Sequence, residues 1–377
     1  MNLLIHDLTA AEWELAKDDY KDWTVISDNG TIRPCIGCFC CWTGGKGECV
    51  FRDGYENMGS LIHEADEMVV MSRYTYGGFS SFVKNVFDRS IGYVLPEFET
   101  AYGVMHHKKR YAGDRPVTFR FRGSALTKAD KEKARNYVAA VCRNLRGTVK
   151  EVIFDECAPA KTGTAVPSPR SAGRSGILLA DCSLRGKRSN TAVFLEKLRE
   201  YMDVPAQILS LSDGISPDEA AAAVSRAGTV VLGVPLYVDG LPSPAIRLME
   251  AVKEKYSGDP CRIYAVVNNG LYESRQNDNL LEMIKAWCSD CGFIYSGALA
   301  IGAGEVVGTL MRGQKHALWP ARNALRRLLA LAKAVTGSEE NGDDYADTFL
   351  FPRWLYILIA NTNWQRLKKT AARGKQR

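Results

Sequence analysis

The sequence predicts an α/β protein built from two tandem domains, each with a doubly wound, parallel sheet of five strands. Its 377 residues exceed the roughly 100–200 residues of a typical domain. A stretch rich in Ala, Pro, Gly, Ser and Thr lies near the middle of the chain. Each half alternates short apolar runs with amphipathic segments, which is the pattern of right-handed βαβ units.

In the first half, five short apolar runs predict buried strands. They lie at 2–5, 24–27, 68–72, 117–121 and 149–154. Segments with helical periodicity separate several of them, at 54–64, 79–90 and 128–145. Short, nearly continuous apolar runs are typical of parallel strands that helices cover on both faces.

The second half repeats this alternation. We expect strands at 176–180, 206–211, 229–234, 262–268 and 293–301, and helices at 190–202, 217–226, 245–255 and 280–291. Five strands per half suit the flavodoxin-like strand order better than a six-stranded dinucleotide fold.

The predicted domains follow from these elements and from the composition. They are a first domain at 1–155, a linker at 156–175, a second domain at 176–335, and a C-terminal helical extension with a basic tail at 336–377. Residues 65–88 and 227–250 share an order of strand, Gly-containing loop and Ser-initiated helix. A tandem duplication explains this better than chance similarity between two α/β domains.

Composition and charge exclude several classes of protein. With 46% hydrophobic and 24% charged residues, the chain is neither disordered nor a disulfide scaffold. The net charge of +6 comes from the tail, where 361–377 hold six basic and no acidic residues. The neutral remainder argues against a nucleic-acid footprint. We expect a cytoplasmic protein with no membrane span, because no apolar run reaches about 18 residues.

One loop has the composition of a phosphate site. Between the first strand and first helix of the second half lie the hydroxyls of Ser183, Ser189 and Thr191, with the cations Arg185, Lys187 and Arg188. A helix N-terminus there offers free backbone N–H groups to a phosphate. The alternative is that Ser189 or Asn190 only caps the helix. The pattern is neither a Walker loop nor a Rossmann fingerprint.

This loop resembles the Gly-Ser-Pro-Arg…Ser-Asn-Ser signature of NAD(P)H-dependent FMN reductases and related flavodoxin-like oxidoreductases. In that family the loop holds the phosphate of FMN. The matching positions are Ser183, Arg185, Ser189, Asn190 and Thr191, whereas Cys182 and Leu184 replace a Gly and a Pro.

Two more loops follow the third and fourth strands of the second half. We expect their residues at the same sheet edge as the phosphate loop. An aromatic ring and backbone donors there suit a flat ring with polar edges, such as the flavin ring of FMN, although plain loop packing is the alternative. The candidate residues are Pro235, Leu236, Tyr237, Val238, Asn269 and Gly270.

The first half carries a crowded cysteine motif. Cys35, Cys38, Cys41 and Cys49 have the spacing C-x2-C-x2-C-x7-C, with Cys40 as an extra thiol. Four thiolates in one loop can bind an iron–sulfur cluster or zinc; reduced thiols without a metal are the third alternative. The spacing is similar to that of iron–sulfur flavoproteins, and this resemblance implies a [4Fe–4S] cluster that exchanges single electrons with FMN.

The loop after the first strand of the chain differs from the phosphate loop. It contains Asp7 and Glu12 and no cation. We therefore expect the first domain not to hold FMN in the usual way.

We expect three other features of the sequence to have structural roles. We interpret His106 and His107 as part of a solvated basic loop, with a contact to a substrate or to the phosphate of a nicotinamide nucleotide as the alternative. We interpret Cys288 and Cys291 as packing on a helix. The apolar segment 351–360 is expected to dock on the protein itself rather than lie on a membrane, which leaves 361–377 as a solvated end.

The resemblance implies an FMN-dependent NAD(P)H oxidoreductase that forms a homodimer. Its partners would be a nicotinamide nucleotide and a small electron acceptor, with the cluster as a further electron carrier. No residue stands out as an acid–base catalyst. The alternatives are a non-catalytic FMN electron carrier and a zinc-stabilised interaction protein without flavin.

Overall fold

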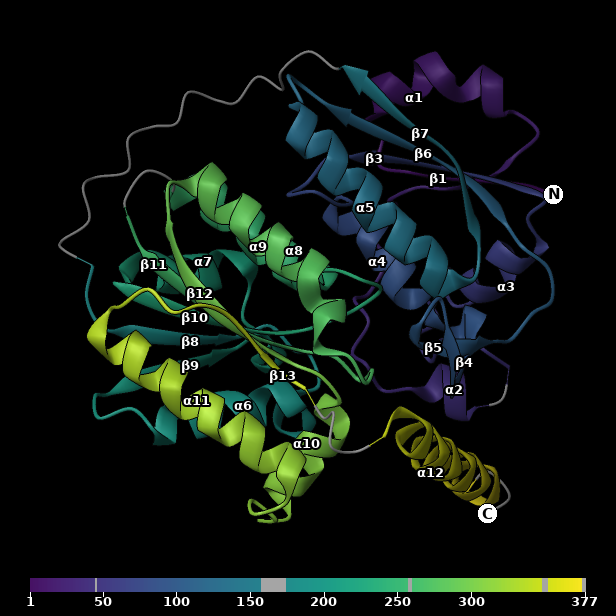
Figure 1. The fold of residues 1–377 in the computed structure, drawn as a ribbon. Coiled ribbons are helices and arrows are strands. Elements are labelled where there is room, and N and C mark those ends of the chain that lie inside the picture. The colour runs from purple at the N-terminus through teal and green to yellow at the C-terminus, as the bar shows by residue number, and fades with distance from the viewer. Residues whose placement is uncertain (45, 157–173, 257–259, 348–351, 375–377) are drawn as a thin grey trace. The chain divides into compact units, whose positions relative to one another are not determined.

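The computed structural model describes residues 1–44, 46–156, 174–256, 260–347 and 352–374. The chain forms two compact units: the first is Met1–Lys161 with Trp354–Arg377, and the second is Thr162–Arg353. Figure 1 shows a large sheet flanked by helices in each unit. Nearly all of the predicted linker at 156–175 lies outside the described residues.

The first unit contains the five strands that the sequence predicts. They are β1 (Asn2–His6), β2 (Thr24–Ile26), β3 (Glu67–Arg73), β6 (Pro116–Gly123) and β7 (Thr148–Glu156). The sheet order is β2-β1-β3-β6-β7, and every pair is parallel. This is the flavodoxin-like order.

Helices of the first unit agree with the prediction where the amphipathic signal is long. These are α3 (Met58–Glu64), α4 (Ser81–Arg89) and α5 (Lys128–Leu145). A further helix, α1 (Ala10–Ala16), was not expected; Thr9 and Glu12 form a capping box at its start.

An antiparallel hairpin of β4 (Val94–Ala101) and β5 (Val104–Lys109) corrects one expectation. His106 and His107 lie on β5, where His106 is buried and His107 half-buried. They are therefore not part of a solvated loop. As expected for neighbours on a strand, the two rings have different surroundings: His106 meets Asn144, and His107 meets Trp42.

The second unit has one strand more than predicted. Its strands are β8 (Ile177–Asp181), β9 (Ala206–Ser210), β10 (Thr229–Pro235), β11 (Arg262–Asn268), β12 (Ile294–Ile301) and β13 (Gly342–Ala346). They form a parallel sheet in the order β13-β12-β11-β10-β8-β9. The sixth strand, β13, comes from the segment assigned by sequence to the C-terminal extension, and it extends the flavodoxin-like order at the β12 edge.

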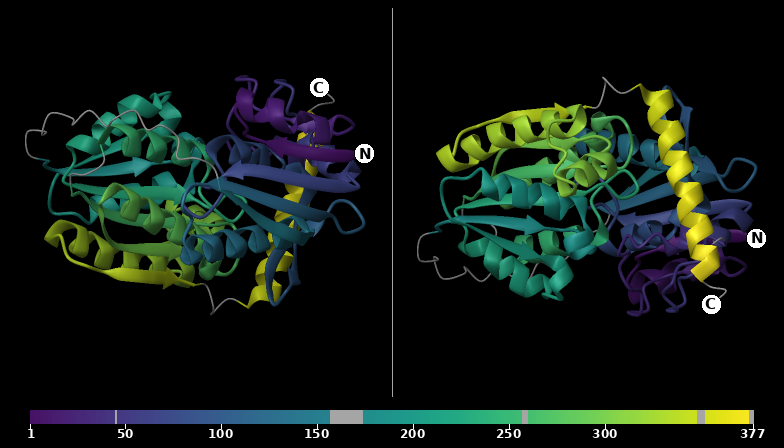
Figure 2. Two further views of the ribbon diagram at one scale, coloured as in Figure 1. Left: turned by 90° about the horizontal axis from the view of Figure 1, so that it is seen from above. Right: turned by 90° about the horizontal axis from the view of Figure 1, so that it is seen from below.

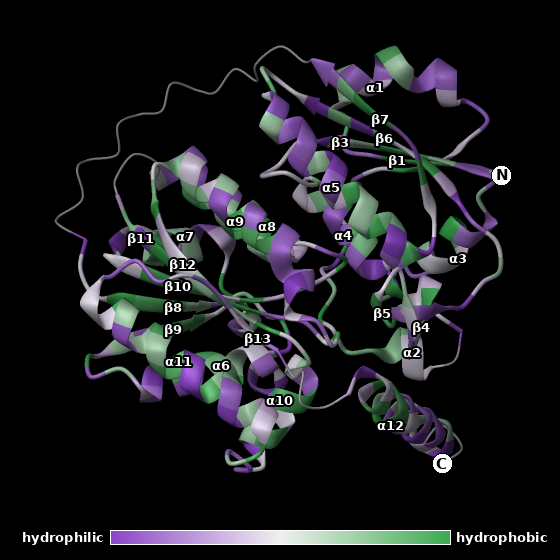
Figure 3. Cartoon of the chain, viewed as in Figure 1, coloured by the Kyte–Doolittle hydropathy of each residue, from purple (hydrophilic) through white to green (hydrophobic). Residues whose placement is uncertain are grey.

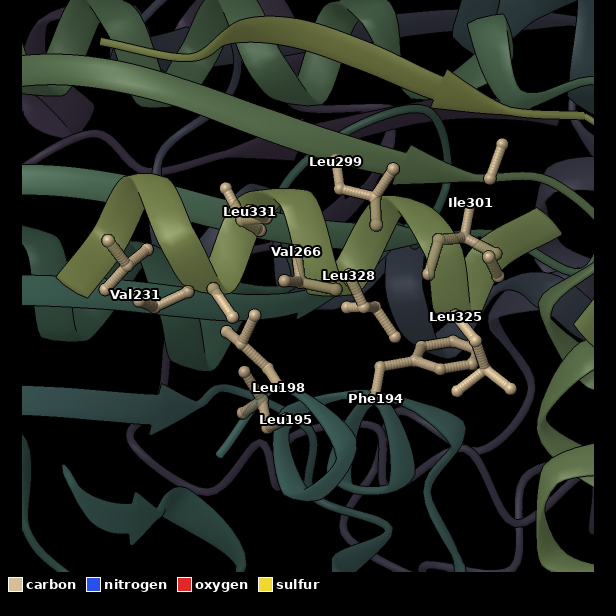
Figure 4. Packing of buried hydrophobic residues seen from close by; sticks show 14 of the residues in the cluster. Phe194, Leu195, Leu198, Val231, Val266, Leu299, Ile301, Leu325, Leu328 and Leu331 are labelled. Carbon is tan, nitrogen blue, oxygen red and sulfur yellow. The ribbon is translucent and has the colours of Figure 1, made fainter. Parts of the chain in front are cut away.

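Six α-helices of the second unit are described. They are α6 (Asn190–Glu200), α7 (Pro217–Arg226), α8 (Ser243–Tyr256), α9 (Asp278–Cys291), α10 (Gly304–Arg312) and α11 (Trp319–Gly337). In one core layer, Phe194 and Leu198 of α6 meet Leu328 of α11 and side chains of the sheet (Figure 4). Cys288 and Cys291 are buried on α9, in keeping with a packing role.

Both units share an unusual turn after the third strand of their sheets. Thr75 pairs with Gly78 in the first unit, and Tyr237 pairs with Gly240 in the second. The two central residues have positive φ in each turn, including the non-glycine pair Val238 (39°) and Asp239 (58°). Turns with positive φ at both central residues usually contain Gly, Asn or Asp at these positions. The recurrence of such a turn at the same place in both units fits a tandem duplication.

The helix α12 (Arg353–Gly374) belongs to the first unit. It contacts the β4–β5 hairpin through Asn361 and Lys368, so residues beyond 360 are not a solvated end as expected from the sequence. Figure 2 shows it as one straight helix. In the described part of the chain, no helix is long and apolar enough to cross a membrane.

Candidate functional site

Three loops of the second unit lie at one edge of its sheet. They follow β8, β10 and β11, which are neighbouring parallel strands. The carboxyl ends of such strands meet at the same edge, and a change in strand order there opens a crevice for ligands. The structure thus brings the predicted FMN residues to a common edge.

The loop after β8 buries its hydroxyls. Ser183, Ser189 and Thr191 are each at most 2% exposed. Ser189 caps α6 by accepting the N–H of Ala192 at 3.4 Å, so the predicted capping role exists. The hydroxyl of Ser183 accepts the N–H of Arg185 at 3.3 Å. The N–H groups of α6 that precede Ala192 have no carbonyl partner within the helix, and such groups can bind an anion.

Helix α10 supplies two charged residues that the sequence did not single out. Glu305 accepts a hydrogen bond from Asn190 Nδ2 at 2.7 Å and lies 3.8 Å from the Arg185 guanidinium. Arg312 donates to Asn190 Oδ1 at 2.6 Å. A phosphate on Arg185 would therefore share that guanidinium with the Glu305 carboxylate.

A buried acid lies directly before this loop. Asp181 is 2% exposed and accepts the N–H of Ser183 at 3.0 Å, and Ser210 donates to it at 3.5 Å. Burial raises the pKa of Asp181 to about 7, and the nearby charge of Asp213 adds to this. The loop therefore has a carboxyl at its base that is partly protonated near neutral pH.

The other two loops contribute mainly backbone. Pro235, Leu236, Tyr237 and Val238 are all half-buried, and the N–H of Leu236 donates to the Asn268 carbonyl at 2.8 Å. Asn268 also donates to the Thr191 hydroxyl at 2.8 Å, which links this edge to α6.

Asn269 has a structural role in the third loop. Its side chain accepts the N–H of Leu271 at 3.0 Å and donates to the Glu273 carbonyl at 3.0 Å. Gly270 is exposed, and a Cβ on it would meet open space. Of the two, Gly270 is the residue whose surface a ligand could approach.

The corresponding edge of the first unit has a cavity of about 410 Å³. Its lining includes His6, Asp7 and Trp13, and the Trp13 ring stacks on His6 at 4.6 Å. Arg122 of β6 donates to Asp7 at 2.8 Å and also pairs with Glu12. The two acids of this loop are thus paired with a cation from β6.

The four predicted metal ligands surround one small hollow in the first unit. Its lining includes Cys35, Cys38, Cys41 and Cys49 but not the exposed Cys40. Arg89 donates its Nε–H to Cys49 Sγ at 3.0 Å and forms a buried ion pair with Asp53 at 2.8 Å.

Burial favours the neutral form of two of these thiols, Cys35 and Cys41. Burial raises the pKa of Cys41 to about 12, and it raises the pKa of Cys35 further; neighbouring thiols of the motif contribute to both shifts. Among the described residues, no three His, Cys, Asp or Glu side chains are arranged to hold a single metal ion.

Aromatic side chains hold the cysteine loop against the rest of its unit. The Phe39 ring stacks on Trp42 at 5.0 Å, and the Trp42 indole N–H donates to the Ile91 carbonyl at 2.9 Å. Trp42 also contacts His107, whose pKa burial lowers to about 4. His107 is therefore a neutral packing residue at physiological pH.

Comparisons with known proteins give structural matches only. No protein-family model and no curated protein matches the chain. The azoreductase AzrA is similar to it at 12% identity and a TM-score of 0.31, over 42% of this chain and 99% of that one. An azoreductase from Bacillus anthracis matches at 13% identity and a TM-score of 0.30, over 42% and 98% of the two chains.

A third structure, an FMN-dependent NADH-azoreductase from Bacillus anthracis in complex with FMN, is 17% identical with a TM-score of 0.31. The match covers 44% of this chain and 100% of that one. At such values the likeness assigns no activity to this protein.

Proposed function

We propose that this protein is an FMN-dependent NAD(P)H oxidoreductase whose second unit binds FMN. The observation that carries the proposal is the convergence of three loops at the carboxyl edge of the second sheet. One of them combines buried hydroxyls, a cation and a helix N-terminus. This combination is what a phosphate monoester needs.

The phosphate would be held by the loop after β8, through Ser183, Arg185, Ser189, Asn190 and Thr191. The flavin ring would lie against the other two loops, over the backbone of Pro235–Val238 and beside Asn269 and Gly270. Bound FMN supplies the redox chemistry, which takes two electrons from a reduced nicotinamide and passes them on. The chain orients the ring and limits the access of water to it.

In the first unit, we propose a [4Fe–4S] cluster on Cys35, Cys38, Cys41 and Cys49. A bound cluster would carry single electrons between the flavin and an acceptor. Arg89 supports this assignment, since its N–H⋯S contact with Cys49 would stabilise a thiolate ligand. Zinc at the same thiols remains the alternative.

The first test is the absorbance spectrum of anaerobically purified protein. Bound FMN gives bands at about 370 and about 450 nm, and a cluster adds a broad shoulder. Steady consumption of NAD(P)H identifies an enzyme, whereas a single reduction without turnover identifies an electron carrier. A colourless protein that does not take up added FMN would refute the proposal.

The phosphate loop is tested by Arg185→Ala. Loss of one charged hydrogen bond should weaken FMN binding about tenfold or more, as measured by quenching of flavin fluorescence. Affinity for riboflavin, which lacks the phosphate, should stay the same. Arg199→Ala is the matched control, because Arg199 is at the other end of α6 and pairs with Glu196. Equal losses for FMN and riboflavin would place the phosphate elsewhere.

Neighbouring cysteines provide a matched pair for the metal site. Cys38 and Cys40 are both exposed, but only Cys38 lines the hollow. We expect Cys38→Ser to lose most of the bound iron, as measured by elemental analysis, and Cys40→Ser to retain it. If elemental analysis finds zinc instead of iron in both proteins, the site is a zinc site and not a cluster. Iron that both variants retain would contradict the ligand assignment.

A further inference from the structure

Helix α12 docks on the first unit through one face. The Asn361 amide accepts the N–H of Phe98 at 2.7 Å and donates to its carbonyl at 3.0 Å. The Trp364 ring meets Trp42 edge-on at 5.4 Å. Lys368 pairs with Glu97 at 2.6 Å. Asn361, Trp364 and Lys368 recur at helical spacing, so the docked side of α12 is well defined.

On its exposed side, α12 carries large apolar side chains, and Trp354, seven residues before Asn361, lies at the edge of this side. Trp354 is 67% exposed, Leu358 57% and Ile359 50%. Scattered exposed apolar residues are ordinary, but three within six positions of one helix form a patch. Figure 3 shows the hydrophobic colour concentrated in the first half of α12.

The same face turns cationic further along. Arg366 and Arg373 follow Ile359 at intervals of seven residues, and Lys369 follows Leu358 at eleven. With about 3.6 residues per turn, these intervals return to nearly the same side of a helix. All three cations are exposed. Residues 348–377 contain no Asp or Glu, so the exposed face has no acid to balance them.

We propose that this exposed side of α12, termed the α12 outer face and comprising Leu358, Ile359, Arg366, Lys369 and Arg373 with Trp354 at its edge, binds the surface of an anionic lipid bilayer. Exposed Trp and aliphatic side chains can enter a membrane interface while the long side chains of neighbouring Lys and Arg reach the headgroups. Its cations are attracted to acidic headgroups, and Trp is favoured at the interface. In a parallel pair of such helices the same cations would meet, which argues against that form of self-association.

This binding is peripheral and does not depend on the proposed redox function. The docked face anchors α12 to the first unit, so the unit itself would be carried to the bilayer. The sequence offered two alternatives for this segment, docking on the protein and contact with a membrane. In this proposal, different sides of the same helix do both.

Cosedimentation of the full chain with lipid vesicles tests the proposal. Vesicles of phosphatidylcholine with about 30% phosphatidylglycerol should bind the protein, and pure phosphatidylcholine vesicles should not. Binding should weaken as salt rises, because headgroup attraction is screened. The triple variant Arg366→Glu, Lys369→Glu, Arg373→Glu should lose roughly a hundredfold in affinity.

A charge-matched control separates the patch from the net charge. The triple variant Lys21→Glu, Lys128→Glu, Arg143→Glu changes the net charge equally at exposed sites on other elements, and it should bind within about twofold of the parent. Trp354→Ala should weaken binding about tenfold without changing the spectrum of the protein.

Three results would overturn the proposal. Equal binding to neutral and anionic vesicles would remove the role of the cations. An equal loss in the control triple variant would reduce the effect to net charge. A dimer in light scattering that Trp354→Ala dissociates, with no vesicle binding, would assign the face to a second copy of the chain.

Discussion

At the scale of single residues, Asp181 is the most unusual group near the phosphate loop. Its carboxyl is 2% exposed and accepts hydrogen bonds from the Ser183 N–H at 3.0 Å and from the Ser210 hydroxyl at 3.5 Å. No cation is among the causes that shift its pKa, and burial dominates them. The folded protein therefore favours the protonated form of this acid far more than the unfolded chain does.

This imbalance predicts a pH-dependent stability. The pKa of Asp181 is about 7 in the folded protein and about 3.9 in an unfolded chain. The folded state binds the extra proton between these values, so stability falls as pH rises from about 4 to about 7, by about 3–4 kcal/mol at most. Asp181→Asn keeps an acceptor for Ser183 and removes the titration.

We expect Asp181→Asn to gain stability over the parent chain at about pH 8 and to lose that advantage near pH 4. Calorimetry of the transition that belongs to the second unit measures both. Asp203→Asn changes an exposed acid in the same unit and should stay within about 0.5 kcal/mol of the parent. If the difference in the free energy of unfolding between Asp181→Asn and the parent stays constant with pH, Asp181 does not have the raised pKa.

At the scale of elements, close packing of α10 on the start of α6 shapes the phosphate loop. Gly308 makes this possible: a Cβ there would lie 2.3 Å from Asn190 Oδ1. Asn190 is held by Glu305 and Arg312 and has little freedom to move. The close contact between these helices thus depends on a glycine, which has no side chain, at position 308.

Gly308→Ala should force the two helices apart. We expect a destabilisation of about 1–3 kcal/mol from overpacking, and weaker FMN binding if the loop shifts with α6. Gly313→Ala is the control near the end of α10, since its Cβ would meet its nearest atom at 3.4 Å. Calorimetry measures the stability of both variants, and titration measures their affinity for FMN. If Gly308→Ala and Gly313→Ala change these quantities equally, the close contact at Gly308 is unimportant.

Elements with strong patterns could be predicted from the sequence. All ten predicted strands lie within about two residues of those observed, because each contains a short apolar run. In contrast, β13 contains Gly-Asp-Asp-Tyr-Ala and β5 contains His-His-Lys-Lys, so neither has an apolar pattern. β13 forms by pairing with β12, which is distant in the chain, and β5 forms by pairing with β4 in a tight hairpin, so backbone pairing rather than an apolar pattern defines both strands.

The candidate sites show the same limit. The hydroxyls and cysteines could be found because they cluster in the sequence. Glu305 lies 115 residues from Asn190, and Arg122 lies 115 residues from Asp7. Their contacts arise only when strands and helices assemble, so the charge balance of both sheet edges could not be predicted from the sequence.

At the scale of the whole molecule, the first unit is discontinuous in sequence. Residues from both ends of the chain build it, with the second unit inserted between them. Trp364 and Asn361 of α12 complete the packing around Phe39, Trp42 and Phe98. Each unit has its own sheet, so we expect two separate unfolding transitions.

A pair of tryptophans on α12 tests this organisation. Trp364→Ala removes two edge-on aromatic contacts and should destabilise the first unit by about 1–3 kcal/mol, with the transition of the second unit unchanged. Trp354→Ala changes a side chain that is 67% exposed, so it should leave both transitions within about 0.5 kcal/mol of the parent.

The two variants should also differ in their affinity for lipid vesicles, and here Trp354→Ala should have the larger effect. Trp354 belongs to the α12 outer face, whereas Trp364 belongs to the docked face, so only Trp354→Ala should lose affinity for anionic lipid as long as the first unit stays folded. Calorimetry and cosedimentation on the same preparations separate the two roles. If both transitions shifted together in Trp364→Ala, the units would unfold as one, and the end of the chain would stabilise the whole molecule rather than the first unit.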